Sequence, residues 1–522
     1  MTGVQTCALP ICSLPDLAEF LHGATIAINT VLERKGARTA LITTKGFRDV
    51  YAIGRSNRIE AFNLFFHRPK PLAPRHLTYE LDERLNHAGA ALKALQPAEV
   101  ETIAKTLVAE GVEAVAVCLL HSYANPAHER AVGEILRRLC PKIYVTLSHE
   151  ILREFREYER TSTTVLNAYV GPRVSNYLAT LEDYLRGDKF PGKLHMMRSN
   201  GGVMSVAQAK TQPVSMMESG PVAGMIGAGK LALHLGIERC IGFDMGGTTA
   251  KCSLITRGAA AVEEGYVIGE PASGQPMQLP VVDIVEVGTG GGSIAWVDGA
   301  GGLHVGPKSA GADPGPACYG KGSLDPVITD SDLVLGRINP GRFLGGGMKL
   351  DVAAAERAIQ AKVGRPLNLS VKESALGIAT IADTAMSLAV RAVSVNKGVD
   401  PRETAMIAFG GAGPLHAIAV AREIFIPRVI IPKLPGTFSA LGMLMANWRQ
   451  DFVRTLVGGL EKIDPALVQK VFAELTDDAH AQLARDGVSK EGAEFKYYAD
   501  MRYVGQEHAL QIPLRDASML SG

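Results

Sequence analysis

The stretch Cys240-Ile-Gly-Phe-Asp-Met-Gly-Gly-Thr-Thr-Ala-Lys-Cys-Ser-Leu-Ile255 decides the fold. Its apolar residues alternate up to two glycines and then resume, which predicts a strand, a tight turn and a returning strand. Because glycine has no Cβ, Gly246 and Gly247 allow backbone N–H groups to face an anion at close range.

The side chains around this turn add polar groups that bind phosphate. Thr248 and Thr249 supply hydroxyl donors, and Lys251 supplies a positive charge. Asp244 ends the first strand, where a carboxylate is placed to hold a hydrated Mg²⁺ or to orient a water. An ordinary hairpin needs none of these groups, so we interpret the turn as a phosphate-binding loop.

A second stretch, residues 224–230, fits the first half of a Walker A loop. Leu231 stands where that loop needs a serine or threonine for Mg²⁺, and no buried strand leads into the stretch. We therefore predict a helix with small residues at close-packing positions.

A third glycine cluster follows the predicted buried strand that begins at Ala405. Here Gly410, Gly411 and Gly413 precede a helix that starts near Pro414. Backbone without side chains allows a flat base or ribose to lie against it, and a helix N-terminus favours anions. We predict that this cluster contributes to the same nucleotide site.

The bulk composition sets the class of protein. With 522 residues, two or three domains are expected. Lys and Arg (54) balance Asp and Glu (53), which argues against nucleic-acid or membrane-surface partners. No apolar run approaches the roughly 20 residues of a membrane helix. The seven cysteines form no CxxC pair, which indicates free thiols in a reducing cytoplasm.

Alternating elements in the first part of the chain predict an α/β layer. We expect helices over 17–34, 97–110 and 126–139, and strands over 39–43, 112–120 and 143–147. A second α/β layer is expected over 194–431. A helix over 465–486 and strand-like residues 497–512 are expected to follow.

Several motifs in order resemble those of the hydantoinase A/5-oxoprolinase/acetone carboxylase β-subunit family. They are His22-Gly-Ala-Thr25, residues 33–49, Ser148-His-Glu150 with Glu157-Tyr-Glu-Arg-Thr161, Arg198-Ser-Asn-Gly-Gly202, Ser219-Gly-Pro221, Asp244-Met-Gly-Gly-Thr-Thr249, Glu286-Val-Gly-Thr-Gly-Gly-Gly-Ser-Ile294, Ala312-Asp-Pro-Gly-Pro-Ala-Cys-Tyr-Gly320 and Phe409-Gly-Gly-Ala-Gly-Pro414. The resemblance implies an actin-like ATPase (ribonuclease H-like) fold with two related subdomains, and ATP with Mg²⁺ as cofactors.

The two ends depart from the family pattern. Residues 1–12 resemble translated sequencing adapter, and the family's first Asp-x-Gly-Gly-Thr hairpin is missing before residue 21. The expected domains are an incomplete N-terminal domain at 13–190, the ATPase domain at 191–450, and the start of a truncated C-terminal domain at 451–522. Without the first hairpin, weak or absent ATP hydrolysis is expected.

Other polar residues near the glycine clusters are candidates for catalysis or substrate binding. Asp283 and Glu286 are candidates for acid/base or Mg²⁺-associated roles, with capping of the following turn as the alternative. His22, Arg198, Asn200 and Asp313 are weaker candidates for substrate contact, and a local structural role is the alternative for His22 and Asp313.

The family resemblance implies an ATP-dependent hydrolase subunit that opens a cyclic amide of the hydantoin or 5-oxoproline type. The carbonyl oxygen would be activated by phosphorylation, and a hydantoinase B-like partner subunit would complete the reaction. Two alternatives remain open at this point: the nucleotide-binding subunit of a ketone carboxylase, and an actin-like nucleotide switch without substrate chemistry.

Overall fold

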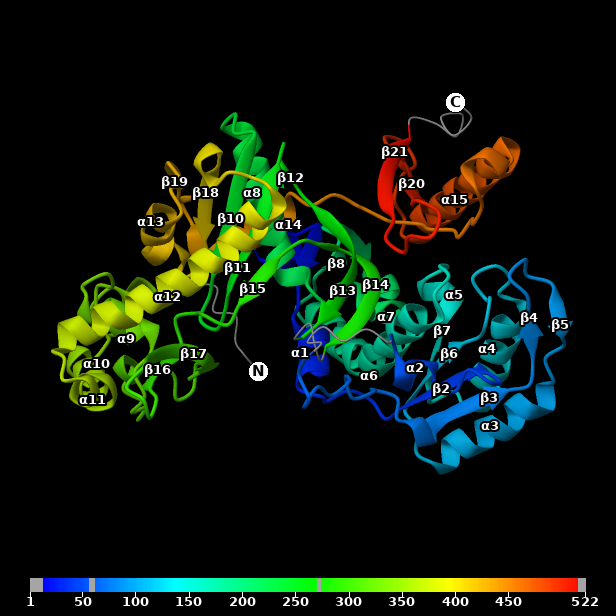
Figure 1. The fold of residues 1–522 in the computed structure, drawn as a ribbon, viewed down its shortest axis with the longest axis horizontal. Coiled ribbons are helices and arrows are strands. Elements are labelled where there is room, and N and C mark those ends of the chain that lie inside the picture. Colours follow the sequence, from blue (N-terminus) through cyan, green and yellow to red (C-terminus); the bar gives the residue numbers. More distant parts are fainter. Residues whose placement is uncertain (1–12, 56–61, 270–273, 515–522) are drawn as a thin grey trace.

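The computed structural model describes residues 13–55, 62–269 and 274–514. The adapter-like residues 1–12 and the cysteines among them lie outside these ranges. Figure 1 shows two α/β bodies, with a smaller C-terminal segment above the N-terminal body.

A four-stranded parallel sheet forms the core of the N-terminal body, in the order β3-β2-β6-β7. Its strands are β2 (Thr39–Thr44), β3 (Thr78–Leu81), β6 (Ala114–Cys118) and β7 (Tyr144–Leu147). Helices α3 (Pro97–Ala109) and α4 (Ala127–Leu139) pack on one face, and α6 (Glu157–Gly187) packs on the other. Burial on both faces explains the nearly continuous apolar run that predicts β6. Strands β2 and β7 were also predicted, whereas β3 was not.

The predicted helix over 17–34 is wrong in its first half. Residues Glu19–His22 form strand β1, which pairs in parallel with β8 (Lys193–Met197), and only Ile26–Leu32 are helical as α1. Strand β8 pairs in turn with β9 (Val203–Ser205). A partner more than 170 residues away determines the strand, so local sequence periodicity does not reveal it.

A mixed sheet forms the core of the second body, in the order β12-β11-β10-β18-β19. Its strands are β10 (Arg239–Met245), β11 (Ala250–Thr256), β12 (Ala259–Ala260), β18 (Ala405–Phe409) and β19 (Arg428–Ile430), and β15 (Val285–Val287) adds to β11. The predicted hairpin is confirmed, because β10 and β11 are antiparallel while β18 runs parallel to β10. This arrangement is that of the expected actin-like fold.

Helices cover both faces of the mixed sheet. Helices α12 (Val371–Val393) and α13 (Gly413–Glu423) pack on one face, and α8 (Ser219–His234) packs on the other. The Walker-like stretch lies inside α8, and a Cβ on Gly224 would lie 2.3 Å from the Phe409 ring. The prediction of a close-packed helix there is confirmed.

The remaining elements surround these cores. They are α2 (Val50–Ile53), β4 (Arg84–Leu85), β5 (Ala91–Lys93), α5 (Ser148–Ile151), α7 (Val206–Thr211), β13 (Val262–Ile268), β14 (Gln275–Val282), β16 (Ser293–Val297), β17 (Leu303–Ser309), α9 (Ile328–Val334), α10 (Val352–Ile359), α11 (Arg365–Leu367) and α14 (Phe438–Leu444). The β13–β14 hairpin packs against α6.

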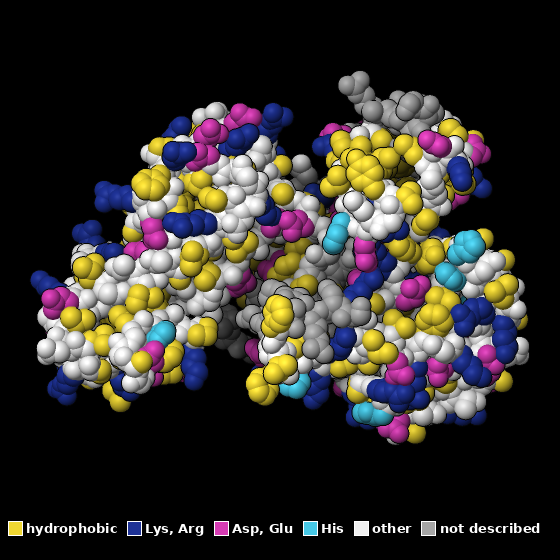
Figure 2. Space-filling model, viewed as in Figure 1, with side chains coloured by type: hydrophobic (Ala, Val, Ile, Leu, Met, Phe, Trp, Pro, Cys, Tyr) yellow, Lys and Arg dark blue, Asp and Glu magenta, His cyan; other side chains and the backbone are white. Residues whose placement is uncertain are grey.

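The C-terminal segment contains helix α15 (Pro465–Arg485) and the hairpin of β20 (Tyr497–Met501) and β21 (Leu510–Leu514). Tyr498 and Leu510 on this hairpin are exposed, and Figure 2 shows an apolar patch there at the upper right. Within the described ranges, one helix has the length and hydropathy of a membrane span, Val371–Lys397, and half of it is buried. It includes the core helix α12.

Candidate functional site

The turn between β10 and β11 presents a row of unused backbone donors. In the described part of the chain, the N–H groups of Gly247, Thr248 and Thr249 have no hydrogen-bond partner, whereas that of Gly246 donates to the Thr249 carbonyl at 3.1 Å. A Cβ added to Gly246 or Gly247 would meet nothing within 4 Å. The turn is therefore an open cradle of N–H groups that fits a phosphate.

Charged side chains flank this cradle on the two strands. Asp244 and Lys251 face each other in the β10–β11 register, and Lys251 forms an ion pair with Glu286 of β15 at 3.1 Å. Burial raises the pKa of Asp244 to about 6, and Lys251 opposes this shift. A half-buried carboxylate beside a phosphate cradle fits a hydrated Mg²⁺, which would favour the ionised form.

The glycine-rich loop 288–292 lies directly on the cradle. Gly291 and Gly292 donate backbone hydrogen bonds to the Gly246 and Gly247 carbonyls at 3.0 and 2.6 Å. A Cβ on Gly290 would lie 2.5 Å from Thr248 backbone, so only glycine permits this approach. The loop thus satisfies the carbonyls of the turn and leaves its N–H groups free.

The loop that contains Asp313 continues from this contact. The Ala310 N–H donates to the Gly292 carbonyl at 2.9 Å, and Asp313 itself is exposed three residues further on. The structure therefore places the Asp313 loop beside the phosphate cradle.

The third glycine cluster closes the other side of the site. The Ala412 N–H donates to the Met245 carbonyl at 3.0 Å, and a Cβ on Gly410 would lie 2.4 Å from Asp244 Oδ1. Gly413 begins α13, and a Cβ on Gly411 would face open space. Residues 410–413 therefore lie against the strand end that carries Asp244.

His22 ends strand β1, and the loop that follows it contacts helix α8. In the first turn of α8, the Ser219 hydroxyl accepts from the Ala24 N–H at 3.2 Å and donates to the Ala24 carbonyl at 3.0 Å. The His22 ring is hydrogen-bonded to the Tyr177 hydroxyl at 2.6 Å, and burial lowers its pKa. These contacts fit the local structural role.

Three other predicted residues lie outside this group. Asp283 forms an ion pair with Lys397. Among the described residues, its carboxylate accepts no hydrogen bond from the N–H groups of the cradle. Arg198 Nη1 donates to Gln450 at 2.9 Å, and Asn200 Nδ2 donates to Asp451 at 2.6 Å. Arg198 and Asn200 therefore line a separate pocket under α15.

The sequence did not single out the residues that fix the site's loops. Thr329 at the start of α9 donates both its N–H and its hydroxyl to the Gly291 carbonyl, each at 2.8 Å. Buried His416 on α13 bridges Asp383 at 2.6 Å and Asp332 of α9 at 3.0 Å, and both carboxylates raise its pKa to about 9 against burial. The only sequence signal for His416 was its position two residues after Pro414, directly behind the third glycine cluster.

The mixed sheet, its hairpin and the loops at one edge define an actin-like ATPase fold. The chain belongs to the hydantoinase/oxoprolinase family, whose sequence profile matches residues 160–452, while the profile of the family's N-terminal region matches residues 10–140. The family inferred from the motifs is thereby confirmed.

Relatives in several organisms resemble the chain over most of its length. An uncharacterised protein of Methanocaldococcus jannaschii is 42% identical, with 94% of this chain and 73% of the relative covered. The caprolactamase alpha subunit of Pseudomonas jessenii is 32% identical over 95% of this chain and 71% of its own. The 5-oxoprolinase of Saccharomyces cerevisiae is 32% identical over 94% of this chain and 40% of its own.

Two solved structures have the same fold. The ATP-dependent caprolactamase from Pseudomonas jessenii matches with a TM-score of 0.83 and 31% identity, covering 97% of this chain and 74% of that chain. A nucleotide-free acetone carboxylase matches with a TM-score of 0.78 and 30% identity over the same shares. The predicted actin-like fold class is confirmed.

Proposed function

We propose that this chain is the ATP-binding subunit of an ATP-dependent hydrolase that opens a cyclic amide. The observation that carries the proposal is the row of three free N–H groups at Gly247, Thr248 and Thr249 between two charged side chains. A phosphate chain would lie on these donors, and the adenosine would lie against Gly410, Gly411 and Gly413. The names of two relatives, a caprolactamase subunit and a 5-oxoprolinase, support a lactam as substrate.

The proposed chemistry matches what the cradle can do. The oxygen of an amide is a poor leaving group, and ATP supplies the phosphoryl group that turns it into a good one. The chain's task is to hold the phosphates in line and neutralise their charge. Thr248 and Thr249 donate hydrogen bonds, Lys251 contributes charge, and Asp244 would hold Mg²⁺ through water.

Glu286 is proposed as a proton-transfer group near this centre. Its carboxylate contacts Lys251, so it can accept a proton only where the phosphate competes for that lysine. The Asp313 loop lies beside the cradle and is proposed to border the substrate. His22, which ends strand β1, is proposed only as a weaker substrate contact. Asp283, paired with Lys397, is proposed as a second acid/base group only if that ion pair opens on binding.

Several relatives are named as enzyme subunits, which supports the proposal that this chain also has a partner subunit. We propose a hydantoinase B-like partner and a cytoplasmic location, in keeping with the five described cysteines, all of which are free and buried. A ketone carboxylase is the second candidate, because the acetone carboxylase structure matches nearly as well as the caprolactamase.

A matched pair of lysine variants tests the nucleotide site. Lys251→Gln is expected to weaken ATP binding roughly 10- to 100-fold, the effect of losing one charge-assisted hydrogen bond to phosphate. Lys230→Gln is the control, because Lys230 is exposed on α8 and belongs to the Walker-like stretch. Affinities are measured by calorimetry on the purified chain with MgATP. Unchanged binding in Lys251→Gln, or equal loss in both variants, would refute the proposed site.

Substrate choice is tested by ATP turnover in the presence of the partner subunit. Caprolactam, hydantoin, 5-oxoproline and acetone are compared at equal concentrations. Stimulation by a lactam or hydantoin supports the amidohydrolase, and stimulation by acetone with bicarbonate supports the carboxylase. ATP hydrolysis that proceeds at a measurable rate but is unaffected by any of these four compounds would contradict both.

A further inference from the structure

A second pocket, of about 400 Å³, lies between helix α15 and the N-terminal body. Its volume is within the range of small-molecule sites, about 300–1,000 Å³. The walls come from stretches of chain that are distant in sequence: residues 149–154, 198–200, 277–280, 450–454 and three side chains of α15. None of the residues of the phosphate cradle lines it.

Two arginines in these walls lack an acidic partner. Within the described ranges, neither Arg153 nor Arg198 forms an ion pair, and the Nε of Arg198 has no hydrogen-bond partner. Arg198 is only 8% exposed, and burial lowers its pKa although Asp451 and Asp486 lie nearby. A buried guanidinium without a paired carboxylate is costly, and an anionic ligand would remove that cost.

Within the described ranges, the acidic groups of the pocket form no ion pair with these arginines. Asp478 is paired with Arg454, and Asp451 accepts hydrogen bonds from Asn200 and Arg449. Burial and the neighbouring carboxylates Glu264 and Asp500 raise the pKa of Glu154 to about 8, so Glu154 is mostly protonated at neutral pH. A protonated carboxyl group can donate a hydrogen bond to an anion.

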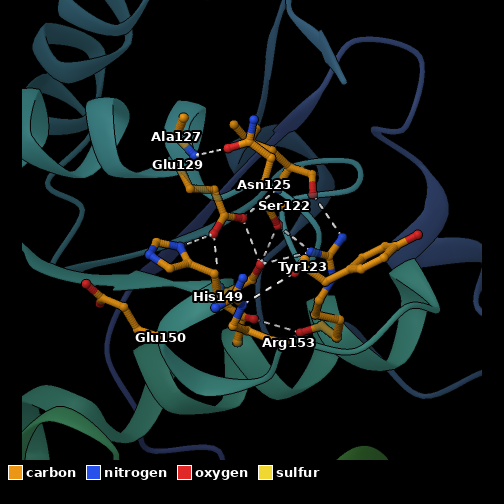
Figure 3. Close-up of polar contacts among 12 residues, drawn as sticks. Ser122, Tyr123, Asn125, Ala127, Glu129, His149, Glu150 and Arg153 are labelled. Atoms are coloured by element: carbon orange, nitrogen blue, oxygen red, sulfur yellow. Dashed lines mark hydrogen bonds and ion pairs between the residues drawn. The ribbon is translucent and has the colours of Figure 1, made fainter. Parts of the chain in front are cut away.

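A buried network holds the wall that carries Arg153 (Figure 3). The carboxylate of Glu129 accepts hydrogen bonds from the Ser148 hydroxyl at 2.7 Å and from the His149 N–H at 3.0 Å, and it contacts His149 Nδ1 at 2.7 Å. These bonds fix α5, which leads directly into Arg153. A wall fixed before binding lowers the entropic cost of binding a ligand.

We propose that this pocket binds a small organic carboxylate, with Arg153 and Arg198 as its anion-binding groups. The assignment of ligand class rests on the proposed function, since opening a cyclic amide creates a carboxylate and a ring such as 5-oxoproline already carries one. A hydrogen bond joins the pocket wall to Glu218, directly before α8. Ser199 in this wall accepts that bond from the Glu218 N–H at 3.0 Å, and Lys251 lowers the pKa of Glu218, which burial raises.

A pair of ring compounds tests the ligand class. Calorimetry on the full chain compares 5-oxoproline with 2-pyrrolidinone, which has the same lactam ring without the carboxylate. The expected result is at least about tenfold tighter binding of 5-oxoproline, the contribution of a charge-assisted pair. Equal affinity for the two rings, or stronger binding of inorganic phosphate than of 5-oxoproline, would overturn the proposal.

Arginine variants locate the site. Arg198→Gln and Arg153→Gln are each expected to weaken 5-oxoproline binding about tenfold or more and to leave MgATP binding unchanged. Arg138→Gln is the control, since Arg138 is exposed on α4 and pairs with Glu101 instead of lining the pocket. Arg153 is only half-buried, so Arg153→Gln is expected to fold. If Arg198→Gln does not fold, Arg153→Gln alone still tests the proposal.

These experiments distinguish failure of the proposed nucleotide site from failure of the proposed carboxylate pocket. Lys251→Gln is expected to retain 5-oxoproline binding while it loses MgATP affinity. A chain that binds 5-oxoproline through Arg153 but never binds MgATP would refute the nucleotide site and support the pocket. Undiminished 5-oxoproline binding in both arginine variants would refute the pocket, whatever the nucleotide result.

Discussion

Replacing Gly410 with alanine is expected to destabilise the second body and to displace Asp244. Gly410 has a φ of +83°, and a Cβ there would lie 2.4 Å from Asp244 Oδ1 and 2.5 Å from the Met245 carbonyl oxygen. The left-handed backbone costs about 1–2 kcal/mol for alanine, and overpacking costs about 1–3 kcal/mol. The free energy of unfolding should therefore fall by about 2–5 kcal/mol.

Gly411→Ala is the matched control on the adjacent residue. A Cβ on Gly411 meets nothing within 4 Å, and its φ is not positive. Its effect on stability should stay within about 0.5 kcal/mol, the range of most surface substitutions. Because this open space is where the adenosine is proposed to lie, the variant should nevertheless weaken MgATP binding.

Calorimetric melting and MgATP titration distinguish the two variants. For a body of this size, 1 kcal/mol shifts Tm by about 2–4 °C, so Gly410→Ala should melt roughly 4–20 °C lower and Gly411→Ala within about 2 °C of the parent. Equal Tm values for Gly410→Ala and the parent chain would refute the close contact with Asp244. An equal fall in Tm in both variants would refute the argument that only Gly410 lacks room for a Cβ.

Two further predictions concern titrating groups. The pKa of His416 is raised to about 9, so its charge stabilises the fold fully below pH 6.5 and is lost as pH rises through about 9. Tm should therefore fall between pH 7 and 10, and a flat Tm profile in the parent chain would contradict this. His416→Gln should be destabilised by about 3–5 kcal/mol at pH 7, because Asp332 and Asp383 lose their buried cation. Glu154 has a pKa of about 8, so 5-oxoproline binding should weaken as pH rises through 8 and Glu154 ionises. Glu264 also lines the pocket and has a pKa raised to about 7, so Glu154→Gln should remove only the part of the dependence between about pH 7.5 and 9. The same slope in that range in both proteins would count against a role for Glu154.

The fold was predictable where its signals are local. The strand at Ala114–Cys118 is a buried apolar run between the amphipathic helices α3 and α4, and the hairpin at Asp244 carries its glycines in the turn itself. Strand β1 was missed, because Glu19–His22 is extended only through its pairing with Lys193–Met197. The helical periodicity that continues into α1 concealed that boundary.

The phosphate cradle was predictable for the same reason: its donors are consecutive residues. The loops that complete it were predicted as separate motifs, and only the structure shows Gly291 and Gly292 bonded to the turn and Ala412 bonded to Met245. The role of Thr329 depends on a contact across 38 residues, which no spacing rule predicts.

The pocket under α15 was beyond the reach of sequence analysis, although two of the motifs point to it. Ser148-His-Glu150 and Arg198-Ser-Asn-Gly-Gly202 lie far apart in the chain, and neither contributes a donor to the phosphate cradle. They meet because Gln450 and Asp451 return to Arg198 and Asn200, and because α15 then covers the opening. A fold needs no unpaired buried guanidinium at such a junction. Residues of both motifs line the same pocket, and the unpaired Arg198 in its wall therefore favours a ligand over packing as the reason for this arrangement. Ser199 in that wall accepts a hydrogen bond from the Glu218 N–H, directly before α8.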